Sequence, residues 1–464
     1  MGSGAPSRLV DLILGGKLDA LRHDLPELPE LDNLFAPEGP IRDAELLAAD
    51  AFGAAKTWML ANGSTCGVLA SIIACVQWHN SRPGGAPLAD APAGSGGGRK
   101  SVVILPRDAH KSAVHALVLS GATPCFLPPI RHPESGVGLG VGTAELKAAL
   151  KEHGDEVAAV FMVSPTYEGA CSDVTSAAEA CHGAGVPLVV DEAHGAHLAF
   201  LGEAQPPPSR PSEEEEEGRE GKEEEEGGRD KQGGSVFASG GTEGDGGGSG
   251  GGDDFSIERA VTDALATVQS SSPSYLLLAS LDAARWDLAG ATKNAKRRLR
   301  EAALIADGVR EELSSVEGIN VLDLGGESGS AAGCVGTDPL RLTVSFEGGV
   351  GGYEADEILI EDFGVYAELP GPDYVTFVFG PGSTVEHGQR LAEALRHVAL
   401  PAQKRCAHTP QVGIPALLPG EAITQAALDA LAAVKESGGV ISGCSDATLA
   451  TMRVVVDLVP SERR

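Results

Sequence analysis

Apolar residues between positions 56 and 192 follow two alternating patterns. Short, nearly continuous apolar runs bounded by turn residues are typical of strands buried on both faces, whereas longer runs with apolar positions three and four apart are typical of helices. The predicted strands are KTWMLANG (56–63), SVVILP (101–106), TPCFLPP (123–129), VAAVFMV (157–163) and VPLVVDE (186–192). The predicted helices cover 65–80, 110–121, 143–154 and 176–185. This alternation predicts an α/β fold, with a mostly parallel sheet covered by helices on both faces.

The second half of the chain predicts a smaller unit. Residues 256–288 have the pattern of helix, turn and helix, and the runs 340–346, 353–364, 365–369 and 375–381 predict a smaller α/β domain. A last module starts at GIPALLPGEAIT (413–424) and continues to RVVVDL (453–458). We therefore expect four parts: an N-terminal segment (1–54), a large domain (55–313), a small α/β domain (314–400) and a truncated C-terminal domain (401–464).

Two stretches of the large domain have the composition of disordered insertions. Residues 81–100 are rich in Pro, Gly and Ala, and residues 203–254 combine a glutamate run with a glycine tract. Neither stretch has enough apolar side chains to offset the entropy of ordering the chain. The second stretch has 16 acidic and 5 basic residues, and it accounts for about a third of the formal charge of −31.

Charge and hydropathy also limit the classes of partner. The one basic stretch, KNAKRRLR (293–300), is expected to be an exposed helix face, so nucleic-acid binding is disfavoured. No run reaches the ~18 apolar residues that a membrane span needs. The first ten residues lack the apolar core of a signal peptide, which predicts the cytoplasm; a plastid address is the alternative if the N-terminus is truncated. The eight cysteines form no CxxC pair, which favours free thiols over disulfides or a zinc site.

Candidate functional residues follow the predicted strands, where α/β sheets bind ligands. Ser64 and Thr65 lie at a predicted helix start, which either binds a phosphate through hydroxyls and N–H groups or is a plain N-cap. His110 follows the strand 101–106; it is either a ligand contact or a capping or surface histidine.

The motif VVDEAHGAHLAF (189–200) ends another predicted strand. Asp191 is either a helix cap or the partner of a cationic ligand group, and His194 and His197 follow at spacings that do not favour zinc. Together with the phosphate site and a stacking imidazole, these residues describe a ligand with a phosphate, a flat ring and a basic ring nitrogen. Pyridoxal 5'-phosphate fits, because an aspartate keeps its ring nitrogen protonated.

Longer motifs carry a family resemblance that covers most of the chain outside the two insertions. These motifs are HDLPELPELDNLFAPEGPI (23–41), ANGSTCG, AHKSAVHALVLSGATP, SPTYEG, VVDEAHGAHLAF, SSPSYLLLASLDAAR and GIPALLPGE. They resemble the ornithine/lysine/arginine decarboxylase family of pyridoxal-phosphate enzymes. The resemblance implies an aspartate-aminotransferase-like large domain, a basic amino acid as substrate, and a homodimer or higher oligomer with active sites at the subunit interface.

The same resemblance assigns roles to individual residues. Ser64 and Thr65 would hold the phosphate, and His110 would stack on the ring. Asp191 would pair with the pyridine nitrogen, with His194 close to the polar edge of the cofactor. Ser274, in SPSY, would contact the phosphate of the neighbouring subunit.

The chain departs from the family pattern at the lysine that forms the Schiff base with the cofactor. No STHK-like motif follows VVDEAHGAHLAF; Lys222 and Lys231 lie in that interval but follow no apolar strand. A PGHK-like segment before HDLPELP and a stretch before GIPALLPGE are also missing. We therefore identify no catalytic residue and expect the chain to be inactive as given.

Three hypotheses account for the departure. The first is that the chain is a family decarboxylase whose sequence has lost segments through a faulty gene model. The second is that the chain is a genuine non-catalytic paralogue that regulates an active decarboxylase or assembles with it. A transferase or aldolase on the same fold is disfavoured by HDLPELPELDNL and GIPALLPGE.

Overall fold

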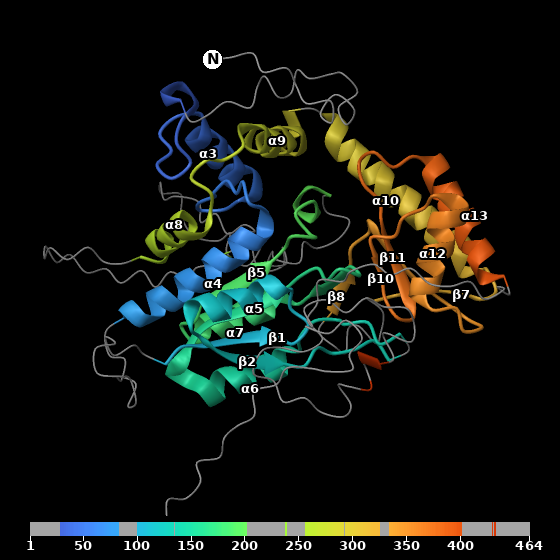
Figure 1. Ribbon diagram of the computed structural model, residues 1–464, viewed down its shortest axis with the longest axis horizontal. Helices are drawn as coiled ribbons and strands as arrows, with labels where there is room; N and C mark the ends of the chain where they lie inside the picture. Colours follow the sequence, from blue (N-terminus) through green and yellow to red (C-terminus); the bar gives the residue numbers. More distant parts are fainter. Residues whose placement is uncertain are drawn as a thin grey trace, which may run out of the picture.

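A computed structural model gives the arrangement of the chain (Figure 1). It describes residues 28–82, 100–133, 135–201, 237–238, 256–291, 293–324, 334–400, 429 and 431–432. The predicted C-terminal domain, apart from residues 429, 431 and 432, therefore lies outside the described residues, as does most of both predicted insertions.

The large domain is built on a five-stranded sheet. In sheet order its strands are β2 (Thr123–Leu127), β1 (Val102–Pro106), β3 (Val157–Val163), β5 (Leu188–Asp191) and β6 (Phe237–Ala238). The first four run parallel, and β6 pairs antiparallel with β5. The predicted α/β fold with a mostly parallel sheet is confirmed. Of the stretch 203–254 the structure describes Phe237 and Ala238, which pair with β5, so the prediction of disorder for that stretch stays a prediction.

Helices cover both faces of this sheet, as the apolar strands predict. Successive side chains of a strand point to opposite faces. Accordingly Val103 and Leu105 pack with α4 (Gly63–Ser81) and α5 (Lys111–Ser120). Val102 and Ile104 pack instead with α6 (Thr143–His153) and α7 (Val174–Gly183). A further helix, α8 (Ile257–Val268), packs along α4 on the side away from the sheet (Figure 1).

One predicted strand is wrong. Residues 56–60 form neither helix nor strand, and the next two are a turn before α4. The N–H of Met59 donates to Glu45 Oε1 at 2.9 Å, and that of Ala61 donates to Gln269 Oε1 at 3.1 Å. The side chains of Glu45 and Gln269 therefore accept the backbone hydrogen bonds that a neighbouring strand would accept in a sheet. Hydropathy alone does not reveal such side-chain partners.

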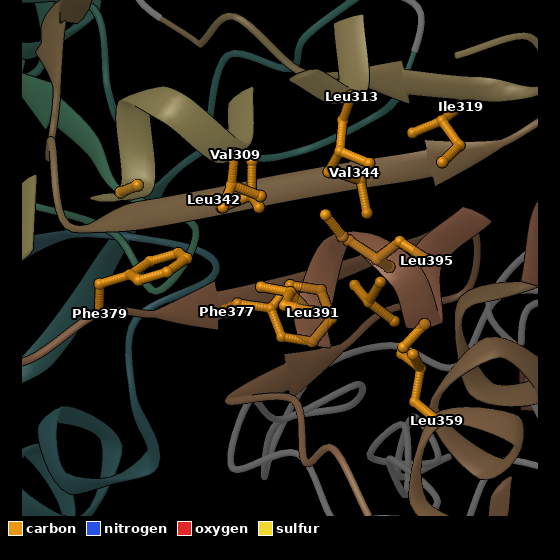
Figure 2. Close-up of a cluster of buried hydrophobic side chains, with 14 of the residues drawn as sticks. Val309, Leu313, Ile319, Leu342, Val344, Leu359, Phe377, Phe379, Leu391 and Leu395 are labelled. Atoms are coloured by element: carbon orange, nitrogen blue, oxygen red, sulfur yellow. The ribbon is translucent and has the colours of Figure 1, made fainter. Parts of the chain in front are cut away.

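The small domain is an antiparallel sheet with helices on one face. In sheet order its strands are β10 (Leu369–Pro370), β11 (Tyr374–Val378), β9 (Arg341–Phe346) and β7 (Ile319–Val321). Alternate residues of β9 pack against α10 (Lys293–Ser314), α12 (Gly352–Phe363) and α13 (Val385–Ala399), as Figure 2 shows for Leu342 and Val344. Although α10 falls in the range predicted for the large domain, its buried side chains belong to this core.

Other elements connect the two domains. The strand β4 (Ala170–Ser172) of the large domain pairs antiparallel with β8 (Cys334–Thr337). The helices α3 (Pro40–Phe52) and α9 (Tyr275–Trp286) pack together through a small apolar cluster. Short helical turns lie at Pro29–Leu31, Gly154–Glu156, Leu198–Phe200 and Asp287–Ala291.

Two predictions on composition are tested within the described residues. The six cysteines in this part of the chain are all free, as predicted. None of the described helices combines the length and apolar character that crossing a bilayer requires.

We predict that Leu395→Ala destabilises the small domain by about 3 kcal/mol, because the fully buried Leu395 side chain would leave a cavity among α10, α12 and the sheet. The matched control is Leu304→Ala on α10, where the side chain is 69% exposed and the expected change is below about 0.5 kcal/mol. Urea unfolding of both variants measures the difference. Equal midpoints for the two variants would contradict the assignment of this core.

Candidate functional site

Asp191 is a carboxyl group without an ion-pair partner in the described part of the chain. It ends β5, and its Oδ1 accepts a hydrogen bond from the Ala193 N–H at 3.1 Å. Burial raises the pKa of Asp191, whereas the Ala193 N–H, His110 and His194 oppose the shift. A partly buried carboxylate of this kind is poised to pair with a cationic group of a ligand.

His110 caps a helix, which is one of the two alternatives that the sequence left open for it. It is the N-cap of α5, where its Nδ1 accepts the Ser112 N–H at 3.3 Å and lies 2.8 Å from Ser112 Oγ. Because Nδ1 accepts, the neutral ring carries its proton on Nε2. Burial lowers the pKa of His110, and Asp191 opposes that shift, so the imidazole lies within electrostatic reach of the carboxylate. The cap fixes the orientation of the His110 ring at the start of α5.

Ser64 and Thr65 occupy the first turn of α4 without capping it. The N-cap residue is Asn62, whose side chain makes no capping hydrogen bond. Both hydroxyl-bearing residues are exposed, so the plain N-cap alternative does not describe them. Ser64 and Asp191 line one cavity of about 350 Å³ between α4, β5 and α8. A helix start and a carboxylate thus face the same space.

The loop that carries Ser274 lies beside the same helix start. Asn62 Oδ1 accepts the Ser270 N–H at 3.0 Å, which ties this loop to the beginning of α4 within one chain. Ser274 itself is the N-cap of α9 and is half-buried. Its predicted contact with the phosphate of a neighbouring subunit stays a prediction.

His194 is held by a residue that the sequence analysis did not single out. Arg341 Nη2 donates to His194 Nδ1 at 2.9 Å, and Arg341 Nη1 donates to the carbonyl oxygen of Tyr167 at 2.8 Å. The rings of Tyr167 and His194 contact each other, with centroids 4.3 Å apart. Burial and Arg341 lower the pKa of His194, and a neutral ring with an accepting Nδ1 keeps its proton on Nε2.

Asp338 completes this arrangement from the start of β9. Its fully buried carboxylate accepts from His197 Nε2 at 2.9 Å and from the Leu340 N–H at 2.9 Å, and it lies 3.6 Å from Arg341 Nε. Both histidines that follow Asp191 are therefore fixed by the small domain. The charged residue near the start of the apolar run LRLTVSF was the sequence signal for Arg341, and Tyr167 lies in the family motif SPTYEG, although neither was assigned a role; Asp338 gave no signal.

Arg341→Gln is expected to raise the pKa of His194, because it removes a neighbouring positive charge while an amide N–H can still donate to Nδ1. Leaving Asp338 without its cation is expected to cost about 3 kcal/mol of unfolding free energy. NMR titration of the histidine Cε1–H signals, assigned with His194→Gln, measures the first effect and urea unfolding the second. Arg298→Gln, at an exposed ion pair, is the control. A pKa of His194 that is unchanged or lower in Arg341→Gln would contradict the expected effect of the Arg341 charge.

Comparison with known sequences gives relatives along nearly the whole chain. The chain is 30% identical to an arginine decarboxylase of Bacillus subtilis over 483 residues, covering 94% of this chain and 90% of that protein. It is 28% identical to an arginine decarboxylase of Halalkalibacterium halodurans, with 94% and 89% covered.

Solved structures share the fold at lower identity. The constitutive lysine decarboxylase of E. coli matches with a TM-score of 0.56 and 16% identity, over 84% of this chain and 55% of that one. The lysine decarboxylase LdcF of Francisella novicida matches with a TM-score of 0.58 and 16% identity, over 86% and 58%. The chain thus spans little more than half the length of these two enzymes.

A family model also matches the chain, over residues 13–81 and 95–326, and it is described as Orn/Lys/Arg decarboxylase, major domain. These residues include the strand ends that carry His110, Asp191 and His194, together with the start of α4. The extent of this match and the 30% identity over nearly the full length lead to one conclusion: the chain belongs to the Orn/Lys/Arg decarboxylase family.

Proposed function

We propose that the chain is a pyridoxal-phosphate-dependent decarboxylase of a basic amino acid that binds the cofactor without the usual covalent lysine, and that its turnover is severely reduced. The observation that carries the proposal is the Asp191 carboxylate, which has no ion-pair partner among the described residues and lines a cavity together with the start of α4. A protonated ring nitrogen would supply the missing cation, and a phosphate would meet the N–H groups and hydroxyls of the helix start.

Ser64 and Asp191 line the cavity, whereas Thr65, His110 and His194 do not line it, and together these residues supply the groups that the cofactor would need. Ser64, Thr65 and the first N–H groups of α4 would bind the phosphate, and Asp191 would hold the proton on the ring nitrogen. His110 lies within electrostatic reach of Asp191, and the Nε2–H of His194 is available as a donor. When bound, pyridoxal phosphate supplies an electron sink for the carbon that loses carbon dioxide.

The covalent lysine is the part that does not fit. Lys222 and Lys231 lie outside the described residues. Among the described residues that line the cavity, Lys56 is the one lysine; its side chain is exposed, with Nζ 4.8 Å from the centre of the Trp58 ring. Lys56 precedes α4 and therefore comes before the motif VVDEAHGAHLAF in the sequence. The lysine of the family pattern comes after that motif.

Arginine is the substrate that the relatives favour. Three relatives with about 90% of their length matched are named arginine decarboxylase, and a lysine decarboxylase of Pseudomonas aeruginosa matches over 39% of this chain. The rival proposal is a non-catalytic paralogue that regulates an active decarboxylase, or assembles with it. The glutamate-rich stretch in the interval of the missing lysine favours this rival, because it could serve as an interaction segment.

Cofactor titration followed by borohydride reduction tests the proposal. Absorbance and fluorescence titration of the purified chain with pyridoxal phosphate should show saturable binding. Asp191→Asn should weaken that binding at least tenfold, while the exposed control Asp263→Asn on α8 should not change it. Peptide mass spectrometry after reduction should find no stoichiometric lysine adduct. An adduct abolished by Lys56→Ala, or one at Lys222 or Lys231, would overturn the claim that a covalent lysine is missing.

Release of carbon dioxide distinguishes the proposal from its rival. Arginine, lysine and ornithine should each be assayed with the chain alone; slow release with arginine supports the proposal, and no release with any of them supports the paralogue. Sequencing the transcript across Phe200 to Phe255 tests the origin of the departure. A segment with an STHK-like motif there would identify the chain as an incomplete copy.

Asp191→Asn is also expected to stabilise the chain without cofactor by about 1 kcal/mol at pH 7, because it removes a carboxylate that burial disfavours. Burial raises the pKa of Asp191 in the folded state. The free energy of unfolding of the unmodified chain therefore falls as pH rises through that pKa, because the buried carboxyl becomes charged. The advantage of the variant should therefore shrink as pH falls and disappear below about pH 3, where the aspartic acid is protonated in both states. Thermal unfolding at about pH 3 and pH 7 measures this, and an advantage that is equal at both values would contradict it.

A further inference from the structure

The two imidazoles that act on Asp191 share a hydrogen-bonding feature. His110 and His194 are both half-buried, and in each ring Nδ1 faces a group that can only donate. The donor is the Ser112 N–H at 3.3 Å for His110 and the Arg341 guanidinium at 2.9 Å for His194. A protonated imidazole carries a hydrogen on both ring nitrogens, so protonation would break this contact. The constraint is stricter at His194, because Ser112 Oγ, 2.8 Å from the other ring, can also accept.

The guanidinium of Arg341 is held in place for this contact. Its side chain is 5% exposed, Nη1 donates to the carbonyl oxygen of Tyr167 at 2.8 Å, and Nε lies 3.6 Å from Asp338 Oδ2. The Tyr167 ring also contacts the His194 ring, with centroids 4.3 Å apart. Turning the guanidinium away from His194 would therefore break its contacts with both domains.

Charges on several elements act on His194. Burial and Arg341 lower its pKa, as does His110, whereas Glu368, just before β10, and Asp191 raise it. Two carboxylates thus favour a protonated His194, and the Arg341 guanidinium opposes them. Without Arg341 the ring would gain a proton more readily.

A protonated His194 would compete with a ligand for Asp191. The carboxylate has no ion-pair partner among the described residues, and His194 lies within electrostatic reach of it. An imidazolium at that position would stabilise the charged form of Asp191 and partly neutralise it. A cationic group of a ligand would then gain less from the same carboxylate.

We propose that Arg341 is a positioning residue, which keeps His194 neutral and thereby leaves the charge of Asp191 available to a cationic group of a ligand. The small domain in this way sets how strongly the large domain binds that ligand. The inference rests on the proposed function where the ligand is pyridoxal phosphate. The ionisation of Asp191 in the chain without cofactor does not depend on that function.

Carbon-13 NMR titration of the Asp191 carboxyl, assigned with Asp191→Asn, tests the proposal in the full chain without cofactor. In Arg341→Gln the pKa of Asp191 should fall, because a more readily protonated His194 stabilises the carboxylate. A direct effect of the lost guanidinium has the opposite sign, since removing a positive charge raises the pKa of a carboxyl group. An Asp191 pKa that is unchanged or raised in Arg341→Gln overturns the proposal.

Two further variants show whether the effect passes through His194. In His194→Gln no imidazole can be protonated, so adding Arg341→Gln should not lower the pKa of Asp191; a fall there overturns the proposal. Arg341→Lys retains a positive charge and N–H donors, and it should keep the pKa of Asp191 close to that of the unmodified chain. Arg396→Gln, at an exposed ion pair of the small domain, is the matched control.

Folding of each variant is verified by circular dichroism and thermal unfolding. Arg341→Gln leaves the buried Asp338 without its cation, which destabilises the fold. If Arg341→Gln alone does not fold, the same titration is run on Arg341→Gln with Asp338→Asn, where both charges are removed and an acceptor for His197 remains.

Titration with pyridoxal phosphate at about pH 6 and about pH 8.5 connects the inference to the proposed function. Arg341→Gln should weaken binding about fivefold at the lower pH and less than twofold at the higher, because His194 is protonated only at the lower value. An equal loss at both pH values would indicate a purely structural role and overturn the proposal. If the unmodified chain does not bind pyridoxal phosphate at either pH, the proposed function fails, and the Asp191 titration still decides the role of Arg341.

Discussion

The ion pair between Asp338 and Arg341 is the interaction on which the geometry of the site depends. Both side chains are buried at the start of β9, and each also bonds to the loop that follows Asp191, one through His197 and the other through His194. A buried ion pair adds little net stability, but it fixes a geometry because breaking it leaves a charge without a partner. The small domain thereby sets the orientation of residues that belong to the large domain.

This coupling explains why the backbone near Gly169 is unusual. Gly169 has a φ of +101°, and a side chain there would come within 2.8 Å of the Arg341 Cβ. The absence of a side chain lets the segment before β4 approach β9 closely enough for the Tyr167 carbonyl to accept from Arg341. One glycine in SPTYEG thus connects a motif of the large domain with the cation of the small domain.

The fold could be predicted from the sequence where hydropathy alone determines an element. The strands β1, β3 and β5 are apolar because both of their faces are buried, and the predicted ranges contain them. Trp58, Met59 and Leu60 also form an apolar run, but the Met59 and Ala61 N–H groups donate to Glu45, 14 residues from Met59, and to Gln269, 208 residues from Ala61. The same distinction applies to the site. His110 and Asp191 were found because they lie at the ends of apolar strands, whereas Asp338 acts through a contact between the domains, which no local pattern encodes.

The edge of β5 has a consequence for how the chain behaves among its own copies. Within the described residues, β6 pairs with Leu188 and Val189 only, so the last two residues of β5 lack a strand on that side. An uncovered strand edge is a template for strand addition by another chain, and a charged side chain there opposes it. The carboxylate of Asp191 lies at this end of the strand. The carboxyl group of Asp191 therefore places a negative charge where the described pairing between β5 and β6 stops, which opposes the addition of a strand from another copy at that point.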